Sequence, residues 1–445
     1  MASTSSNSSL FHRSLEKAYP TAVNGEGVYL VTSDGRKVFD GSSGAAVSSL
    51  GHGNEEIIDA ICQQARSLAF AHSSFFTSDP AEELAQVLLK NSQDAFAKVL
   101  FLTSGSEAVE SALKLARQYH VYNGQLERVN FIGRLNSYHG NTLGALAAGN
   151  NPARRDTFAP ILAPVFHHVQ RCFYQADGQG LGEKAYEDKL IAEYEETFAR
   201  LGLETIAAVI VEPVVGATIG SVPATQSYLP RLSELCKRHG ALLIYDEVMC
   251  GMGRVGSYHA WESLGGVAPD LQTIGKGLGA GYQPLSAVLI GKTVYETFQQ
   301  HSKGSKTFLS GHTFQGHSMG CAGALAVQKI LERDNLVSNC QRMGQVLYDT
   351  LFAELPTQFK QNSGKLRGLG LFRTVDFGDM GKAYGGPLAK EVAEKSFQLG
   401  AAVYLCSPVV DAILFCPPFI MTEEETVKLA RIFIQALRAV LDTRK

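Results

Sequence analysis

The sequence predicts an α/β protein in which a large domain with a mostly parallel sheet between helices is joined by a smaller α+β domain. Three observations lead to this prediction. The middle of the 445-residue chain alternates strand-like apolar runs with helical periodicity, which is typical of a parallel sheet wrapped in helices. Most of these runs end in a polar or glycine-rich loop. From about Lys329 the pattern changes to helix, loop, strand and helix.

These patterns divide the chain into four segments. Residues 1–15 are rich in serine and lack an apolar core segment, so they predict a disordered leader, with a transit segment as the alternative because acidic residues are absent. Residues 16–62 contain an expected hairpin around Asp34-Gly35 and are assigned to the small domain. Residues 63–328 form the large domain, and residues 329–445 complete the small one.

Six strand-like runs define the expected sheet of the large domain. Ligands of open α/β sheets bind beyond the carboxyl ends of the strands, so the loops that follow these runs are the expected functional site. A helix with one apolar face follows the first run directly, in "SGSEAVESALKLARQYH". The runs are Lys98–Thr103, "RVNFIG" (residues 128–133), Ile206–Pro213, "ALLIYDE" (residues 241–247), Asp270–Gly277 and Leu285–Lys292.

Charge and composition exclude several classes of function. The net charge of −3 and the isoelectric point of about 6.5 leave no basic surface for nucleic acid or for an anionic membrane. No run approaches the roughly 20 apolar residues that a membrane span needs. The eight cysteines are scattered, without Cys-x-x-Cys or zinc-ligand spacing. They predict free thiols in a reducing compartment, hence a cytoplasmic protein without a metal site.

Two of the expected strand-end loops carry candidate binding residues. Gly105 and Ser106 stand between a strand and the start of a helix, where free backbone N–H groups favour an anion. A capping box of Ser104 and Glu107 explains the same residues. Tyr138 could stack on a flat ligand or simply pack at the boundary of the sheet. His139 could act as a general base or as a metal ligand, but no partner stands at metal-ligand spacing.

The next loops carry carboxylates and one lysine. Glu212 and the pair Asp246-Glu247 follow near-continuous apolar runs, so they are either functional groups or solvated rim charges. Lys276 lies between two glycines after a strand, where a bulky ligand could approach the backbone. A semi-buried lysine loses proton affinity and becomes the nucleophilic amine that Schiff-base chemistry needs. A solvent-facing loop lysine is the alternative.

Taken together, these loops resemble the class-III (ω-amino-acid type) aminotransferases, which are pyridoxal-phosphate enzymes of fold type I. The similarity extends in order from about residue 20 to the C-terminus, and the 30-residue separation of Asp246 and Lys276 also fits the family. The matching stretches are "FLTSGSEAVESALKLAR", "YHGNTLGA", "VEPVVG", "LLIYDEVMCGMGRVG", "PDLQTIGKGLGAGYQPLSAVL", "GHTFQGHSMGCAGALAV" and "KLRGLGLF".

The resemblance implies a role for each matched residue. Lys276 would be the Schiff-base lysine that also shuttles the proton, and Asp246 would hold the pyridine nitrogen of pyridoxal 5′-phosphate protonated. Thr313 would reach the phosphate of the neighbouring subunit, which implies a homodimer. Arg367 would contact substrate, or else serve the structure or the entrance. The remaining implied cofactor contacts are Gly105 and Ser106 on the phosphate, Tyr138 and Val248 on the two faces of the ring, and His139 and Glu212.

Two positions depart from the family members that use 2-oxoglutarate with ornithine or GABA. Those members carry an arginine where Leu414 stands, and a glutamate where Ala217 stands, and the two form an ion pair. Losing both together avoids leaving one unpaired charge in a desolvated pocket. The sequence therefore favours a pyruvate-like acceptor. Phe75 and Phe76 resemble the apolar substrate wall of that branch, with a place in the core as the alternative.

The function that this resemblance implies is a transaminase that moves an amino group from an amine or an ω- or α-amino acid to a small 2-oxo acid. A decarboxylase, epimerase, aminomutase or phospho-lyase on the same scaffold is the alternative, because the cofactor residues are shared. A binding protein without activity is a third possibility, which the presence of Lys276 disfavours.

Overall fold

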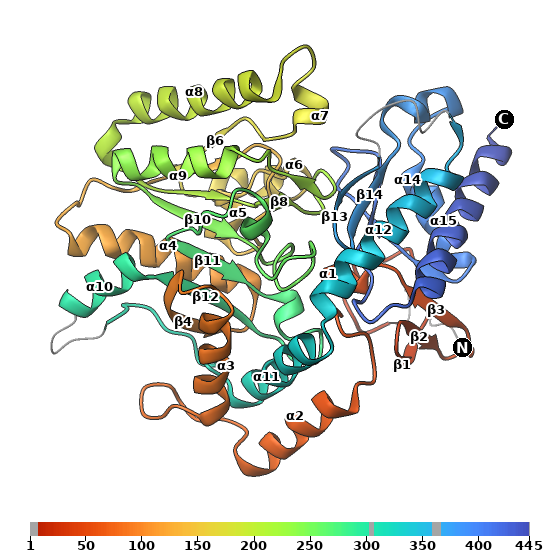
Figure 1. Cartoon of the computed structure of the whole chain (residues 1–445), viewed down its shortest axis with the longest axis horizontal. Coiled ribbons are helices and arrows are strands. Elements are labelled where there is room, and N and C mark those ends of the chain that lie inside the picture. Colours follow the sequence, from red (N-terminus) through yellow and green to blue (C-terminus); the bar gives the residue numbers. More distant parts are fainter. Residues whose placement is uncertain (1–7, 302–306, 358–365, 445) are drawn as a thin grey trace.

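A seven-stranded sheet forms the centre of the molecule (Figure 1). The structure is a computed structural model that describes residues 8–301, 307–357 and 366–444. In sheet order the strands are β4 (Phe96–Leu102), β12 (Ser286–Gly291), β11 (Leu271–Ile274), β10 (Leu242–Asp246), β7 (Ile206–Val211), β5 (Asn130–Arg134) and β6 (Phe166–Val169).

The sheet is mostly parallel, as the sequence predicts. Strands β11, β10, β7, β5 and β6 run parallel to one another, and only β12 runs antiparallel to its neighbours β11 and β4. All six predicted strands are present within a few residues of their expected bounds. The sequence analysis missed β6, an edge strand of four residues of which only Val169 is buried. Its sequence "FHHV" gives no continuous apolar run.

Helices cover both faces of this sheet, which is why its strands read as continuous apolar runs. Every residue of β7 is buried. Ala208 and Ile210 pack with α4 on one face, whereas Val209 and Val211 pack with α8 and α9 on the other. The helices of this part are α2 (Glu55–Ser67), α3 (Asp79–Lys90), α4 (Gly105–Tyr122), α5 (Leu143–Ala148), α6 (Pro152–Arg155), α7 (Tyr174–Asp177), α8 (Glu183–Leu201), α9 (Tyr228–His239), α10 (Lys292–His301) and α11 (Ser318–Arg333).

The C-terminal part builds a second core of its own beside the large sheet (Figure 1). Its four-stranded sheet has the order β13-β14-β17-β16, and α12, α14 and α15 pack in the same region. The elements are α12 (Leu336–Glu354), β13 (Leu366–Leu369), β14 (Phe372–Asp376), α14 (Ala389–Gln398), β16 (Tyr404–Leu405), β17 (Ala412–Phe415) and α15 (Glu423–Thr443).

The N-terminal strands join this C-terminal part. The hairpin expected around Asp34-Gly35 forms between β2 (Tyr29–Thr32) and β3 (Lys37–Asp40). β1 (Ala22–Glu26) pairs with β2, and β15 (Ala401–Ala402) pairs in parallel with β3. Two short strands, β8 (Val214–Val215) and β9 (Val222–Pro223), form a separate ribbon, and α1 (Ser43–Ala46) is a single turn.

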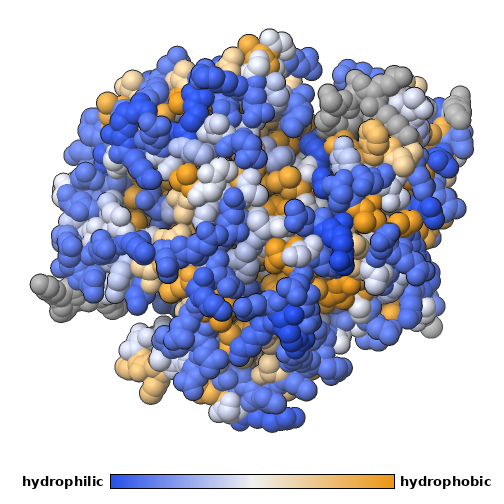
Figure 2. All heavy atoms as spheres, viewed as in Figure 1, coloured by the Kyte–Doolittle hydropathy of each residue, from blue (hydrophilic) through white to orange (hydrophobic). Residues whose placement is uncertain are grey.

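The remaining features of the fold concern the surface, the cysteines, membrane spans and the N-terminal residues. Hydrophilic side chains dominate the face seen in Figure 2, and hydrophobic ones gather toward its middle. All eight cysteines are free, and seven of them are buried. Among the described residues no helix is both long and apolar enough to cross a membrane. Of the leader predicted at residues 1–15, residues 1–7 lie outside the described residues, and residues 8–15 contain neither helix nor strand.

Candidate active site

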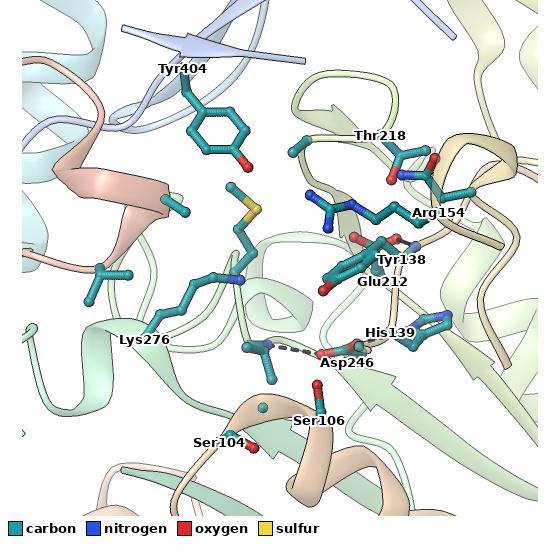
Figure 3. Close-up of a pocket in the computed structure, with 18 of the residues that line it drawn as sticks. Ser104, Ser106, Tyr138, His139, Arg154, Glu212, Thr218, Asp246, Lys276 and Tyr404 are labelled. Carbon is teal, nitrogen blue, oxygen red and sulfur yellow. Dashed lines mark hydrogen bonds and ion pairs between the residues drawn. The ribbon is translucent and has the colours of Figure 1, made fainter. Parts of the chain in front are cut away.

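A cavity of about 840 Å³ opens where the parallel strands of the large sheet end (Figure 3). Each loop that follows β4, β5, β7, β10 and β11 contributes to its wall, as expected for ligand sites of open α/β sheets. The structure brings eight of the residues singled out in the sequence to this one cavity. They are Gly105, Ser106, Tyr138, His139, Glu212, Asp246, Val248 and Lys276.

Lys276 follows β11 directly and begins a short 3-10 turn, Lys276–Leu278. Its φ of 44° lies in the left-handed region, a strained conformation for a residue with a side chain. Burial lowers the pKa of its amine, while the nearby carboxylates of Asp246 and Glu212 act in the opposite direction. The site thus holds an amine that loses its proton more easily than an exposed lysine, which is what a nucleophilic amine requires.

Asp246, the last residue of β10, is held by three hydrogen bonds. Its Oδ1 accepts from the backbone N–H of Val248 at 3.1 Å and from the hydroxyl of Thr273 at 3.0 Å. Its Oδ2 lies 2.8 Å from Nδ1 of His139. Because all three partners come from different elements, the carboxylate has one fixed orientation in the cavity wall.

The neighbouring carboxylate, Glu247, faces away from the cavity. It is fully buried and accepts the backbone N–H groups of Ala260 at 2.7 Å and of Trp261 at 3.0 Å. Burial raises its pKa to about 8, against the effect of these two donors. The two acids that end the run "ALLIYDE" therefore have different roles, since Asp246 faces the cavity and Glu247 anchors the turn after residue 259.

Glu212 links two loops of the site. Its Oε1 accepts the backbone N–H of Tyr138 at 3.1 Å, and its Oε2 accepts that of Gly216 at 3.0 Å. Burial raises the pKa of the Glu212 carboxyl, and the negative charge of Asp246 adds to the effect. Glu212 fixes the position of Tyr138, whose ring lines the cavity.

The start of α4 has the expected capping box and also borders the cavity. Ser104 and Glu107 form a capping box, in which the Ser104 hydroxyl accepts the N–H of Glu107 at 3.2 Å. Gly105 and Ser106 still line the cavity. A Cβ atom on Gly105 would lie 2.7 Å from Cγ1 of Val248, so only glycine lets this turn approach the loop after β10 so closely.

Four other residues singled out in the sequence lie away from this cavity. Phe75 and Phe76 are 78% and 67% exposed, and Phe76 lines a separate cavity of about 260 Å³. Thr313 lies in an exposed turn and does not line the cavity of its own chain. Arg367 is buried on β13, where its Nη1 lies 2.7 Å from Oδ2 of Asp376 and its other nitrogens bond carbonyl oxygens.

The two positions that depart from the related sequences are both uncharged and close to the C-terminal strands. Leu414 is completely buried in β17 within the apolar core that includes α8 and α9. Ala217 lines the cavity, and its carbonyl oxygen accepts the N–H of Ser407 at 2.9 Å. Neither position can provide a charge to a substrate.

Sequence reasoning missed several residues of the site, among them Arg154, Thr218, Thr273 and Tyr404. Thr273 lies in β11, opposite Asp246 of the neighbouring strand β10. Because alternate side chains of a strand share one face, the register of these two strands could have identified it. Arg154, Thr218 and Tyr404 come from α6, a loop and β16, and no motif marks them. Within the described ranges no three His, Cys, Asp or Glu side chains are grouped so as to hold a metal ion.

The chain is similar in sequence to one protein family and to individual proteins of other organisms. The family model described as aminotransferase class-III matches residues 12–437. An uncharacterized aminotransferase of Schizosaccharomyces pombe is 36% identical over 443 residues, which cover 97% of this chain and 95% of the relative. A diaminobutyrate–2-oxoglutarate transaminase of Halomonas elongata is 31% identical over 434 residues, with 94% and 90% covered.

Solved structures agree with the sequence relatives. The ω-transaminase of Pseudomonas jessenii, determined in complex with PMP, superposes with a TM-score of 0.89 at 30% sequence identity. The match covers 96% of this chain and 94% of that one. The large sheet, its helices and the C-terminal part therefore have the same arrangement in both proteins.

Proposed function

The chain belongs to the class-III aminotransferases, and on this premise we propose that it moves an amino group from an amine or an ω- or α-amino acid to a small 2-oxo acid, with pyruvate-like acceptors favoured. As a member of the family it has fold type I and depends on pyridoxal phosphate. The two half-reactions use one site in turn, in a ping-pong sequence. One observation carries the proposal: the amine of Lys276 and the carboxylate of Asp246, from adjacent strands, line the same cavity.

The residues of the cavity fit pyridoxal phosphate. The unpaired N–H groups at the start of α4, around Gly105 and Ser106, suit its phosphate. Buried Nε2 of His139 has no hydrogen-bond partner in the described part of the chain. Asp246 offers a fixed carboxylate to a protonated ring nitrogen, and Tyr138 and Val248 provide aromatic and apolar walls. When bound, the cofactor supplies an aldehyde that takes up the amino group and a ring that accepts the electron pair of the broken Cα–H bond.

Lys276 has two tasks in this proposal. Its amine, with its pKa lowered by burial, would hold the cofactor covalently between turnovers. With substrate in the site, the same amine would accept the proton of the substrate Cα and donate it again, because a single base within reach of two carbon atoms can serve both steps. Asp246 supports this transfer, since its negative charge keeps the ring nitrogen protonated.

The preference for a pyruvate-like acceptor rests on Leu414 and Ala217. A second carboxylate, as in 2-oxoglutarate, needs a cation to replace its hydration, and these two positions offer none. The enzyme of Halomonas elongata named above uses 2-oxoglutarate according to its name. This chain is expected to differ from it in acceptor.

Three structural proposals accompany the function. The protein acts as a homodimer in which Thr313 contacts the cofactor of the neighbouring subunit, because the exposed turn of Thr313 leaves it free for another chain. Arg367 serves the structure, since its guanidinium is paired with Asp376. Residues 16–62 and 329–445 form the small domain around residues 63–328, supported by the pairing of β3 with β15. A cytoplasmic location remains a prediction from the free cysteines.

A donor–acceptor screen of the purified holoenzyme tests the proposal. Addition of an amine donor without an acceptor should change the visible absorbance spectrum of the bound cofactor. Later addition of pyruvate should restore the original spectrum. Release of CO₂ or racemisation without this change would indicate one of the other cofactor chemistries. If 2-oxoglutarate restored the absorbance much faster than pyruvate did, the acceptor assignment would be wrong.

A further inference from the structure

Two arginines line the cavity without a carboxylate partner. Arg13 belongs to the stretch before the first strand, and Arg154 to α6. Among residues 8–301, 307–357 and 366–444, neither forms an ion pair. The two acids of the cavity wall have other partners, since Asp246 is next to His139 and Glu212 accepts backbone N–H groups. A guanidinium is always charged, so each of these arginines offers a positive charge that no carboxylate of the described residues pairs with directly.

Arg154 is held in a defined position. Asn151, which lies just before α6, is buried, and its carbonyl oxygen accepts the N–H of Arg154 at 3.0 Å. The Asn151 side chain accepts the hydroxyl of Ser407 at 3.3 Å, which ties α6 to the loop after β16. The guanidinium carbon lies 5.3 Å from the centre of the Tyr138 ring. Among the described residues no such ring contact holds Arg13, although its charge acts on the same two tyrosines, so Arg154 is the more firmly positioned cation.

The charge of Arg154 faces the cavity. Burial raises the pKa of the Tyr138 and Tyr404 hydroxyls, and the positive charge of Arg154 opposes this rise at both rings. Figure 3 shows its side chain passing Tyr138 toward the side of the cavity where Tyr404 and Lys276 lie. Arg155, the next residue, does not line the cavity. Its charge instead affects His168, whose pKa falls to about 4, mainly through burial.

A transaminase that accepts a 2-oxo acid must bind its carboxylate. Leu414 is apolar, and Arg367 is paired with Asp376 outside the cavity wall. Resting on the proposed function, we propose that Arg154 binds the carboxylate of the small 2-oxo acid and of the matching amino acid. The planar guanidinium can donate two parallel hydrogen bonds to it. Thr218, whose buried Oγ1 has no hydrogen-bond partner in the described residues, lines the same cavity and offers a further donor.

A pair of amine donors that differ only in the carboxylate tests this role. Racemic alanine and isopropylamine have the same carbon next to nitrogen, but isopropylamine carries a methyl group in place of the carboxylate. The measured quantity is the alanine concentration that gives half of the maximal change in cofactor absorbance. In the Arg154→Gln holoenzyme this concentration should rise roughly 10- to 100-fold, as for loss of a charged hydrogen bond. The value for isopropylamine should not change. Arg154→Lys should recover part of the loss, because lysine keeps the positive charge but cannot donate two parallel hydrogen bonds to one carboxylate.

Arg155→Gln is the matched control, since it removes the same charge one residue away, outside the cavity wall. Equal effects of Arg154→Gln on both donors, or a carboxylate-specific effect of Arg155→Gln or Arg13→Gln instead, would overturn the assignment. If the unaltered enzyme converts neither donor, the pyruvate-like acceptor of the proposed function fails, because alanine is the amino acid that pyruvate yields.

Calorimetry provides a measurement that needs no turnover. Propanoate has the size and charge of pyruvate but no carbonyl group to react. Unaltered holoenzyme should bind propanoate and not 1-propanol, and Arg154→Gln should weaken propanoate binding by the same factor as for alanine. Propanoate binding that is unchanged in Arg154→Gln would contradict the assignment, whatever the outcome of the amine assay.

Discussion

The imidazole of His139 and the carboxylate of Asp246 form a buried pair, with Nδ1 of the histidine 2.8 Å from Oδ2 of the aspartate. Their side chains are 0% and 6% exposed. His139 fixes one carboxylate oxygen, while the N–H of Val248 and the hydroxyl of Thr273 fix the other. The orientation of Asp246 is therefore set before any ligand enters.

Asp246→Asn should lower kcat by about 100-fold or more, the scale of removing one placed acid–base group. Asparagine keeps the shape of the side chain but loses the negative charge that, in the proposed function, holds the ring nitrogen protonated. Steady-state kinetics at saturating cofactor measure the effect. The melting temperature should stay close to that of the unaltered protein, which excludes unfolding as the cause. Activity within a few-fold of the original would contradict the assigned role.

Lys276→Ala should abolish both the visible absorbance of the bound cofactor and the activity, whereas Lys292→Ala, at an exposed lysine, should preserve both. Apoprotein offers a pH test of the same residue. Because burial lowers the pKa of Lys276, its amine is already neutral at a pH where an ordinary lysine, with a pKa of about 10.4, is still protonated. Capture of cofactor should thus rise with pH and level off below that value. A midpoint at or above it would count against the lowered pKa.

Gly105→Ala should weaken cofactor binding by about tenfold, because the new Cβ would lie 2.7 Å from Cγ1 of Val248 and force the two loops apart. Adding Val248→Ala should recover part of the affinity by removing the clashing atoms, although a wall of the site is lost. Titration of the apoproteins with pyridoxal phosphate gives the four dissociation constants of this cycle. Strictly additive losses would show that the two residues do not interact.

Glu247→Gln should change how stability depends on pH. Burial raises the pKa of Glu247 to about 8 in the folded protein, above the value of about 4.3 in an unfolded chain. Between these values the folded state holds a proton that the unfolded state has released, so this residue makes the protein less stable as pH rises. The melting temperature of the unaltered protein should exceed that of Glu247→Gln by less at pH 9 than at pH 5.

Glu424→Gln, at an exposed carboxylate on α15, serves as the control and should show a constant offset over this pH range. A difference in melting temperature that stays constant over this range would mean that Glu247 is ionised throughout, and would contradict the raised pKa.

Mixing two inactive variants tests the homodimer. In a symmetric dimer with composite sites, Lys276→Ala and Thr313→Ala damage the same site from opposite subunits. Subunits exchanged between the two variants should form mixed dimers with one intact site, so activity should exceed that of either parent. If Thr313 served its own subunit, the mixture would show only the average of the two parents.

The sequence predicted the parts of the site that follow from strand ends. Asp246 closes a near-continuous apolar run and Lys276 follows a predicted strand. In a parallel sheet such strand ends meet at one edge, so the proximity of the two residues agrees with the pattern. The direction in which the Glu247 side chain points did not follow from the pattern, because the residue next to a strand end turns with the loop. Its partners at Ala260 and Trp261 come from a later turn that no periodicity marks.

Packing between distant segments accounts for the other omissions. Arg154 lies on α6, a helix of four residues, and reaches the cavity because Asn151 and Ser407, 256 positions apart, are in contact. No local pattern contains that information. The exposed fractions of Phe75 and Phe76 were equally beyond sequence reasoning, because an apolar side chain can face the core, a ligand or another subunit.

The pairing of β3 with β15 has a consequence for biosynthesis. Phe39 and Ala401 face each other across two neighbouring strands, although more than three quarters of the chain lies between them. A nascent polypeptide emerging from the ribosome exposes the unpaired edge of β3 until β15 has been made. Contacts of such long sequence separation form slowly, so chaperone binding and aggregation compete with completion of this sheet.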